Sequence, residues 1–340
     1  MSHLHSHDRR RRLGDRCIHE MRHSPRTLAR RPGSAGRWFS VAAACSPYGE
    51  FTVRYGLVIV PNDDVQDPAE LARMAEQRGF DCLLFPEHTH IPASCETPFP
   101  LGGELPHYFR RGYDPFISVA AAVGATERIL LGTGVCLIVQ RDPIITAKEV
   151  ATLDRLSGGR FLLGIGAGWN LEEMRNHGTD PSRRFGFMRD RVAAMKAIWS
   201  QDEASYSGRH VAFERIWCWP KPVQQPHPPV LVGGNGPHVL DRVLAYGDEW
   251  SPNPMPVEEL AERMSELRRR TDELGRPPIP VTVLGCPPEP ALVEQLAALG
   301  VERVIFWLPS TSRDEVERTF EDYMAFLRRP GLAEPVVSAS

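Results

Sequence analysis

The segment from Leu130 to Gly159, LLGTGVCLIVQRDPIITAKEVATLDRLSGG, decides the fold of this 340-residue chain. An apolar stretch ends in Gly-Thr-Gly-Val, an Asp-Pro pair then opens an amphipathic helix, and Ser-Gly-Gly closes it. The next stretch, Arg160 to Asn170 (RFLLGIGAGWN), is a second apolar strand that runs into a glycine-rich turn. Because glycine lets a ligand approach the backbone closely, the two strand ends predict a binding site at the carboxyl ends of parallel strands.

Strand-like and helix-like segments alternate from Tyr55 onward. Eight strands are expected, at Gly56–Val60, Asp81–Pro86, Arg128–Val135, Phe161–Gly166, Pro229–Val232, Glu249–Ser251, Ile279–Leu284 and Arg303–Leu308. Eight helices are expected, at Pro68–Arg78, Pro115–Ala125, Pro143–Leu156, Met188–Trp199, Pro237–Tyr246, Pro256–Leu274, Pro290–Leu299 and Arg313–Leu327. Repeated right-handed crossovers of this kind close into a (β/α)8 TIM barrel in the α/β class, with an open doubly wound sheet as the alternative.

Two connections are too long for simple loops. Thr89–Asp114 follows the second strand, so this insertion lies on the catalytic face and is expected to form a lid or substrate wall. Gln201–Pro228 precedes the fifth strand and contains a predicted small hairpin at Tyr206–Phe213. Because a helix-to-strand connection lies at the opposite face of a barrel, the second segment is expected to be structural.

Composition divides the chain into three parts. Residues 1–40 hold ten arginines and only three acids and show no hydrophobic period. We therefore expect a disordered Arg-rich extension over residues 1–50, the barrel domain over 51–330 and a flexible tail over 331–340. Ser40–Cys45 (SVAAAC) resembles a lipoprotein cleavage site, but the apolar stretch before it is too short for a signal peptide.

Net charge and cysteine usage limit the possible partners and the compartment. A formal charge of −3 argues against a nucleic-acid partner, and no apolar run approaches the roughly 18 residues of a membrane span. The seven cysteines are scattered without a Cys-x-x-Cys pair. This pattern predicts a cytoplasmic protein and provides no spacing for a zinc site, so no metal centre is expected.

Glu87 and His88, in FPEHTHIP, end the second predicted strand. A histidine there faces the barrel mouth and titrates near neutral pH, as acid–base catalysis requires. The alternative is a solvent-facing histidine in a polar loop. His90 lies one step further into the loop and is a weaker candidate for the same task.

Three glycine-rich strand ends are candidates for ligand contact. Gly134, Val135 and Cys136 end the third strand, where a backbone bulge or a non-proline cis bond could support a flat ligand; tight strand packing is the alternative. GIGAGW, at 164–169, predicts a close-approach turn with an aromatic lid. Its glycine spacing is wrong for a dinucleotide site, and no acidic residue follows at the required distance.

The fifth strand ends in VGGNGP, at 232–237. Three glycines before a helix N-terminus form a good anion cradle, because free N–H groups and the helix dipole both favour phosphate. No recognisable Ser/His/Asp or Cys/His motif for nucleophilic catalysis is present in the sequence.

Together these motifs resemble the luciferase-like monooxygenase superfamily, and within it the branch of coenzyme F420-dependent oxidoreductases. The resemblance runs from about Tyr55 to Pro254. It is densest in FPEHTHIP, ETPFPLGGELP, DPFISVAAAVGATERILLGTGV, AKEVATLDRLSGGRFLLGIGAGWN and KPVQQPHPPVLVGGNGP. The first predicted strand and the last two resemble the family only loosely. The family's fold is a (β/α)8 barrel, usually a homodimer, which agrees with the independent strand count.

The resemblance implies a task for individual residues. His88 would sit by the ring of the cofactor and aid proton transfer. Glu87 stands where relatives commonly have Asp and would be the catalytic partner of His88. A non-proline cis peptide would fall at Gly134-Val135 or Val135-Cys136 and support the ring, and Trp169 would lie near it. The turns after the fourth and fifth strands would hold the cofactor phosphate through Ala167, Gly168, Gly233, Gly234 and Asn235.

The sequence thus predicts an oxidoreductase that moves a hydride between coenzyme F420 and an unidentified small organic substrate. A two-component monooxygenase that uses reduced FMN is the alternative, because both cofactors present a tricyclic ring and a ribityl phosphate. A second alternative is a flavin-binding barrel without catalysis. The branch-level resemblance favours coenzyme F420.

The extension gives the first testable expectation. Because residues 1–50 lack hydrophobic periodicity, a chain that begins at Phe51 should melt within a few degrees of the full chain. Thermal unfolding followed by circular dichroism measures the difference. A large drop in melting temperature would show that the extension contributes to the core.

Overall fold

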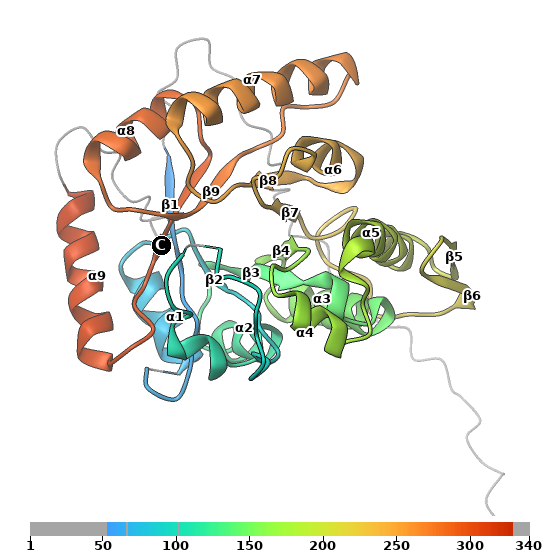
Figure 1. Cartoon of the computed structure of the whole chain (residues 1–340), viewed down its shortest axis with the longest axis horizontal. Helices are drawn as coiled ribbons and strands as arrows, with labels where there is room; N and C mark the ends of the chain where they lie inside the picture. The colour runs from blue at the N-terminus through green and yellow to red at the C-terminus, as the bar shows by residue number, and fades with distance from the viewer. Residues whose placement is uncertain (1–52, 66, 101, 329–340) are drawn as a thin grey trace, which may run out of the picture. The chain divides into compact units, whose positions relative to one another are not determined.

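The computed structural model describes residues 53–65, 67–100 and 102–328. The extension predicted over 1–50 and the tail predicted over 331–340 lie outside the described residues. The described chain forms a parallel eight-stranded sheet with helices around it, which confirms the predicted (β/α)8 barrel (Figure 1).

The barrel strands follow one another in the order β8-β7-β4-β3-β2-β1-β10-β9. Their bounds are β1 Arg54–Val58, β2 Cys82–Phe85, β3 Leu130–Leu137, β4 Phe161–Gly166, β7 Val230–Gly233, β8 Glu249–Ser251, β9 Thr282–Cys286 and β10 Arg303–Trp307. A parallel bridge between Trp250 and Val281 joins β8 to β9 and closes the barrel. Closure brings all the carboxyl strand ends to one mouth.

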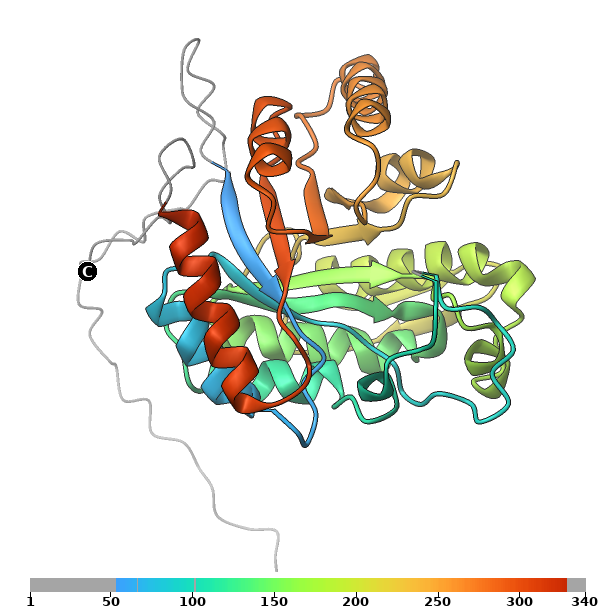
Figure 2. The same cartoon turned by 60° about the vertical axis from the view of Figure 1, so that its left-hand side comes forward.

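The helices cover the outside of the sheet, and α9 lies along β10 and β1 (Figure 2). Their bounds are α1 Pro68–Gln77, α2 Pro115–Val123, α3 Pro143–Leu156, α4 Leu171–Asn176, α5 Arg184–Ser200, α6 Val239–Tyr246, α7 Val257–Glu273, α8 Pro290–Ala298 and α9 Arg313–Leu327. No helix in the described ranges is long and apolar enough to cross a membrane.

Capping explains where three of the expected helices begin, whereas α5 begins at Arg184 rather than at the expected Met188. Asp67, Asp114 and Asp142 cap α1, α2 and α3 with a proline in the first turn, and these helices begin where expected. The short helix α4 was not expected. The helix α6 begins at Val239 rather than at Pro237, because a turn intervenes.

Side chains pack in two layers. The larger core lies between the sheet and its helices. The smaller core fills the barrel and consists of Val58, Cys82, Leu84, Leu162, Leu231, Leu284 and Ile305. The barrel interior is thus packed solid, and ligands are left to the loops at its mouth.

The strands β3 and β4 approach each other more closely than side chains would allow. A Cβ atom on Gly132 would lie 2.1 Å from the Leu162 carbonyl oxygen, and one on Gly164 would lie 2.1 Å from that of Thr133. The strand register shifts between Thr133 and Cys136. The close pairing of β3 and β4 therefore requires glycine at positions 132 and 164.

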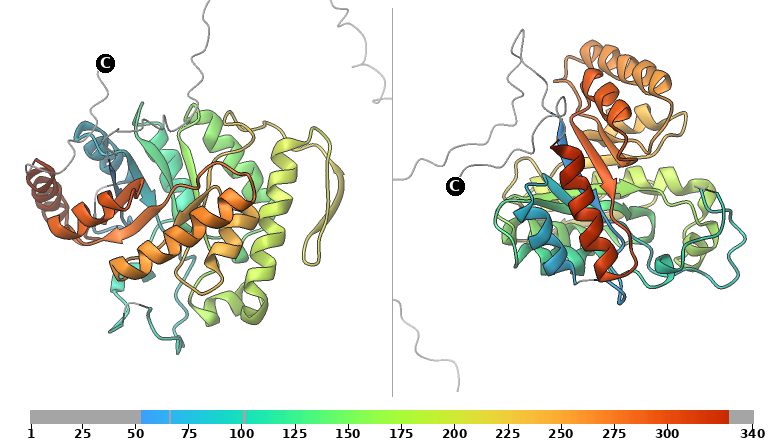
Figure 3. Two further views of the ribbon diagram at one scale, coloured as in Figure 1. Left: turned by 90° about the horizontal axis from the view of Figure 1, so that it is seen from above. Right: turned by 90° about the vertical axis from the view of Figure 1, so that its left-hand side faces the viewer.

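The long connection before β7 contains the predicted hairpin. Its strands, β5 Ala204–Ser207 and β6 Ala212–Ile216, are antiparallel and project beside α5 (Figure 3). The proline-rich segment after the hairpin is fixed to α3, because the buried Asp154 carboxylate accepts the N–H groups of Val223 and Gln224 at 2.5 and 2.9 Å.

A buried ionic network joins the amino ends of the strands, opposite the mouth. Arg303 is 3% exposed. Its Nε donates to Asp81 at 2.5 Å, and its Nη1 lies 3.3 Å from Glu249 and 3.1 Å from the Thr282 hydroxyl. Burial acts to lower the pKa of Arg303, but Glu249 and Asp81 outweigh it and raise that pKa.

Replacing Arg303 should therefore destabilise the barrel strongly. Arg303→Met leaves the Glu249 carboxylate buried without its partner, so the free energy of unfolding should fall by about 3–5 kcal/mol. Urea unfolding measures the change. The exposed Arg209 gives a matched control, Arg209→Met, which should stay within about 0.5 kcal/mol. Similar losses in the two variants would contradict a structural network.

Candidate active site

His88 lies three residues beyond β2, at the mouth of the barrel, and both of its ring nitrogens are engaged. Nδ1 lies 2.7 Å from Oε2 of Glu173, and Nε2 accepts the indole N–H of Trp169 at 3.1 Å. Since Nε2 accepts, the hydrogen bonds assign the ring proton to Nδ1, which donates to the carboxylate. The fold thus fixes one tautomer of His88.

Glu173 comes from α4 and is fully buried. Asn170 caps this helix by accepting the N–H of Glu173, and the Glu173 carboxylate also accepts the backbone N–H of Thr89 at 3.0 Å. Burial acts to raise the pKa of Glu173, but the hydrogen bonds from His88 and Thr89 outweigh it and lower that pKa. Glu173 is therefore an anion at neutral pH and orients His88.

Aromatic side chains surround His88. The rings of Trp169 and Phe109 each meet its imidazole edge to face, with centroids 5.5 Å away. Phe99 packs against both of these aromatic residues. The insertion after β2 and Trp169 line a cavity of about 500 Å³, with Arg110 among its lining residues. The insertion therefore forms a wall beside His88, as its position in the sequence predicted.

Glu87 serves a different purpose from its neighbour His88. Its buried carboxylate accepts the N–H of Leu137 at 2.6 Å and pairs with Arg141 at 2.6 Å. Arg141 also pairs with Asp114 at the start of α2. These bonds tie the end of β2 to the end of β3, so Glu87 holds the site's framework, while Glu173 is the partner of His88.

The end of β3 contains a cis peptide bond between Gly134 and Val135, the first of the two positions that the resemblance implied. A Cβ on Gly134 would lie 2.8 Å from the Leu84 side chain, so packing alone requires glycine there. Val135 packs against the inner core. Cys136 is buried in the outer core, and burial, together with Glu87, raises the pKa of its thiol.

The turns after β4 and β7 have the backbone geometry that glycine permits. Gly168 has a φ of 77° and Gly234 a φ of 112°. The Gly234 N–H donates to the Ser251 carbonyl at 3.2 Å, so this donor is already occupied. Asn235 exchanges hydrogen bonds with Asn253. Ala167 precedes Gly168 and is half-buried, and Gly233 lies against Val135.

Gln140 was not found from the sequence. It follows β3, and both its side-chain amide atoms are buried without a hydrogen-bond partner among the described residues. Its Nε2 lies 3.9 Å from the position of a Cβ on Gly168. A buried amide without partners costs free energy, so Gln140 is a candidate to bond a ligand or a water molecule at this turn.

Two arginines near the β7 turn were also missed. Arg242 on α6 stacks on Phe185 at the start of α5, with its guanidinium 4.1 Å from the ring centre, and Arg184 stacks on the same ring at 4.9 Å. Arg242 Nη2 lies 3.7 Å from the position of a Cβ on Gly236. Positive charge therefore lies beside the glycine-rich turn after β7. The sequence alone did not reveal this, because Arg184 and Arg242 lie on different helices.

A family model, Luciferase-like monooxygenase, matches residues 48–288. An uncharacterized protein of Mycobacterium tuberculosis (strain ATCC 25618 / H37Rv) is 41% identical over 280 residues, which cover 81% of this chain and 99% of that protein. The chain therefore belongs to the luciferase-like monooxygenase family. Members of this family are flavin- or F420-dependent oxidoreductases and monooxygenases, so the protein is an oxidoreductase.

Two further relatives differ in their cofactor. An FMNH2-dependent dimethylsulfone monooxygenase of Pseudomonas putida is 26% identical over 216 residues, 62% of this chain and 55% of that protein. The coenzyme F420-dependent tetrahydromethanopterin reductase from Methanopyrus kandleri has a similar structure, with a TM-score of 0.63 and 17% identity over 83% of this chain and 98% of that one. The second likeness shows the shared fold.

The Glu173 pair should make stability depend on pH. Because the folded-state pKa of Glu173 lies below its ordinary value of 4.5, its stabilisation is present above pH 4.5 and is lost as the pH falls through the folded pKa. Glu173→Gln should lower the free energy of unfolding by about 1–3 kcal/mol at neutral pH and by less in acid. Urea unfolding of the parent and the variant, from neutral pH down through pH 4.5 into acid, measures the difference in their free energies of unfolding.

Glu96→Gln serves as the control, since Glu96 is exposed on the same wall. Its effect should be small at every pH. If the free energy of unfolding lost in Glu173→Gln is the same in acid as at neutral pH, the charge of the Glu173 carboxylate contributes nothing to stability.

Proposed function

We propose that this protein is a coenzyme F420-dependent oxidoreductase that acts on a small organic substrate at the mouth of the barrel. The observation that carries the proposal is His88, held in one tautomer by the buried Glu173 beside an aromatic-walled cavity. When bound, the deazaflavin carries the hydride, and the protein supplies orientation and proton transfer.

His88 moves the proton in this proposal. Its Nε2 lacks a hydrogen and accepts the Trp169 N–H among the described residues, so displacement of Trp169 frees it to accept a proton from a substrate hydroxyl. The imidazolium that forms is stabilised by the Glu173 anion on Nδ1. This is the pairing of a general base with an orienting carboxylate.

The residues at the mouth fit a ligand that carries a phosphate. Gln140 and Gly168 provide an unfilled amide beside a turn of positive φ, and Arg242 stands next to Gly236. We propose that Gln140 bonds the ribityl or phosphate part of the cofactor and that Arg242 and Arg184 balance its negative charge. Because the Gly234 N–H already donates to the Ser251 carbonyl, we propose that Asn235 and Gly236, rather than Gly234, contact the phosphate.

The charge near α6 supports coenzyme F420 over FMN. In F420 a chain of carboxylates follows the phosphate, whereas FMN ends at the phosphate. Arg184 and Arg242, which share the Phe185 ring, suit the more negative ligand. The branch-level resemblance in ETPFPLGGELP and AKEVATLDRLSGGRFLLGIGAGWN supports the same cofactor.

Cofactor binding tests the proposal. The purified protein should bind F420 in the micromolar range or tighter and FMN more weakly, as followed by quenching of tryptophan fluorescence. Gln140→Leu should weaken F420 binding by about tenfold, since a hydrogen bond contributes about 1.4 kcal/mol. Its melting temperature should not fall, because the amide has no partner to lose in the described structure. Gly236→Asp should weaken binding further by pairing with Arg242.

Gly236→Asn is the matched control, because it has nearly the same shape without the charge, and it should bind F420 better than Gly236→Asp. Tighter binding of FMN, with oxygen consumption when reduced FMN is added, would replace this proposal with the monooxygenase alternative. Binding of neither cofactor would overturn it.

A further inference from the structure

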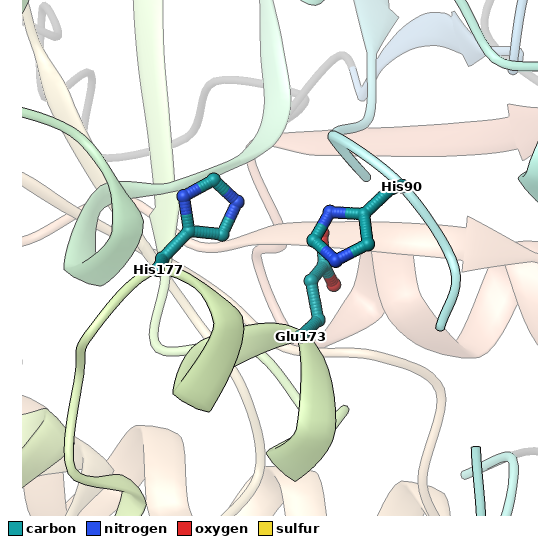
Figure 4. A group of neighbouring side chains, drawn as sticks. All are labelled: His90, Glu173 and His177. Atoms are coloured by element: carbon teal, nitrogen blue, oxygen red, sulfur yellow. The ribbon is translucent and has the colours of Figure 1, made fainter. Parts of the chain in front are cut away.

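A second cluster of ligating side chains adjoins the site, on the solvent side of Glu173. His90 comes from the loop after β2, and Glu173 and His177 come from α4 and its end (Figure 4). One ligand atom of each residue lies within 4.8 Å of those of the other two. His177 is exposed and His90 is half-buried, so ions can reach the cluster from solvent.

We propose that His90, Glu173 and His177 form a binding site for a divalent transition-metal ion of the zinc class. Two imidazoles and one carboxylate are a donor set that suits such ions and leaves coordination positions open. Because Glu173 and His177 are four residues apart, they lie on one side of α4, and the loop brings His90 to them.

The Thr89 hydroxyl marks the point on which the three groups converge. Its Oγ1 lies 2.6 Å from His177 Nε2, 3.0 Å from His90 Nδ1 and 3.3 Å from Glu173 Oε1. Ligand atoms around a tetrahedral zinc ion lie roughly 3.4 Å apart, since each bond is about 2.1 Å long. For an ion to take this point, the Thr89 hydroxyl rotates away and the three ligand atoms, which lie within 4.8 Å of one another, move closer together.

Surrounding groups already orient the proposed ligands. The Asn176 side-chain amide lies 3.0 Å from Nε2 of His90. Metal binding through Nδ1 puts the ring proton on Nε2, and a flip of the Asn176 amide presents its oxygen to accept that proton. The Thr89 N–H and His88 hold the Glu173 carboxylate. Partners of this kind fix ligand orientation in metal sites. An ion here would fasten the wall of the cavity to α4 and share the carboxylate that orients His88.

No metal centre was predicted from the sequence, because the prediction used only the spacing of the cysteines. His90 lies more than eighty residues before Glu173 and His177 in the chain, and only the packing of α4 against the loop joins it to them. The proposal does not depend on which cofactor the enzyme uses.

Zinc binding to the full chain tests the site. The first seven residues contain His3, His5 and His7, which can bind zinc themselves, so the parent protein should have all three replaced by alanine. After chelator treatment and desalting, the parent is titrated with ZnCl2 by calorimetry. One equivalent should bind in the micromolar range or tighter, and zinc should raise the melting temperature. Excess Mg²⁺, which prefers oxygen ligands, should not displace it.

Variants of the parent assign the ion to this cluster. His177→Ala and His90→Ala should each weaken binding by more than about tenfold and abolish the rise in melting temperature. His107→Ala is the control, because His107 is exposed on the same wall and lies outside the cluster. No zinc binding by the parent, or equal binding by the parent and both cluster variants, would overturn the proposal. The exposed His177 keeps the test valid if His90→Ala folds poorly.

Discussion

The hydrogen bond between the buried Glu173 carboxylate and His88 Nδ1 is the interaction on which the candidate site depends. It fixes the tautomer of His88, leaves Nε2 as the acceptor, and ties the loop after β2 to α4 through Thr89. A carboxylate this deeply buried is stable only because these donors surround it. In our proposals, the same charge therefore orients His88 for proton transfer and contributes a ligand to an adjacent metal site.

Two buried glutamates near the site, Glu87 and Glu173, have different partners. Glu87 precedes His88 in the chain, yet it pairs with Arg141 and the N–H of Leu137 behind the site. Glu173 lies 85 residues from His88 and contacts it directly. Glu87 and His88 both lie in the loop after β2 and have different partners, so adjacency in sequence is a poor guide to partnership in the site.

The glycine-rich strand ends likewise combine several constraints. Gly132, Gly134 and Gly164 are required by the closeness of neighbouring strands and side chains. Gly168 and Gly234 are required by positive φ values. In our proposal, the groups that hold the cofactor are therefore those around these turns, namely the amide of Gln140, which has no partner among the described residues, and the arginines beside α6.

The sequence by itself determined the barrel, because the alternation of apolar strands with proline-started helices is a local pattern that crossover geometry converts into one closed fold. It also determined that His88 stands at the mouth, since that position depends only on where β2 ends. Only the tertiary structure decided that Glu173 is its partner, that Glu87 is structural, and that Gln140, Arg242, His90 and His177 border the site. These relations arise from packing α4, α6 and the loop after β2 against one another, and contacts between segments so distant in the chain leave no periodic signal in the sequence.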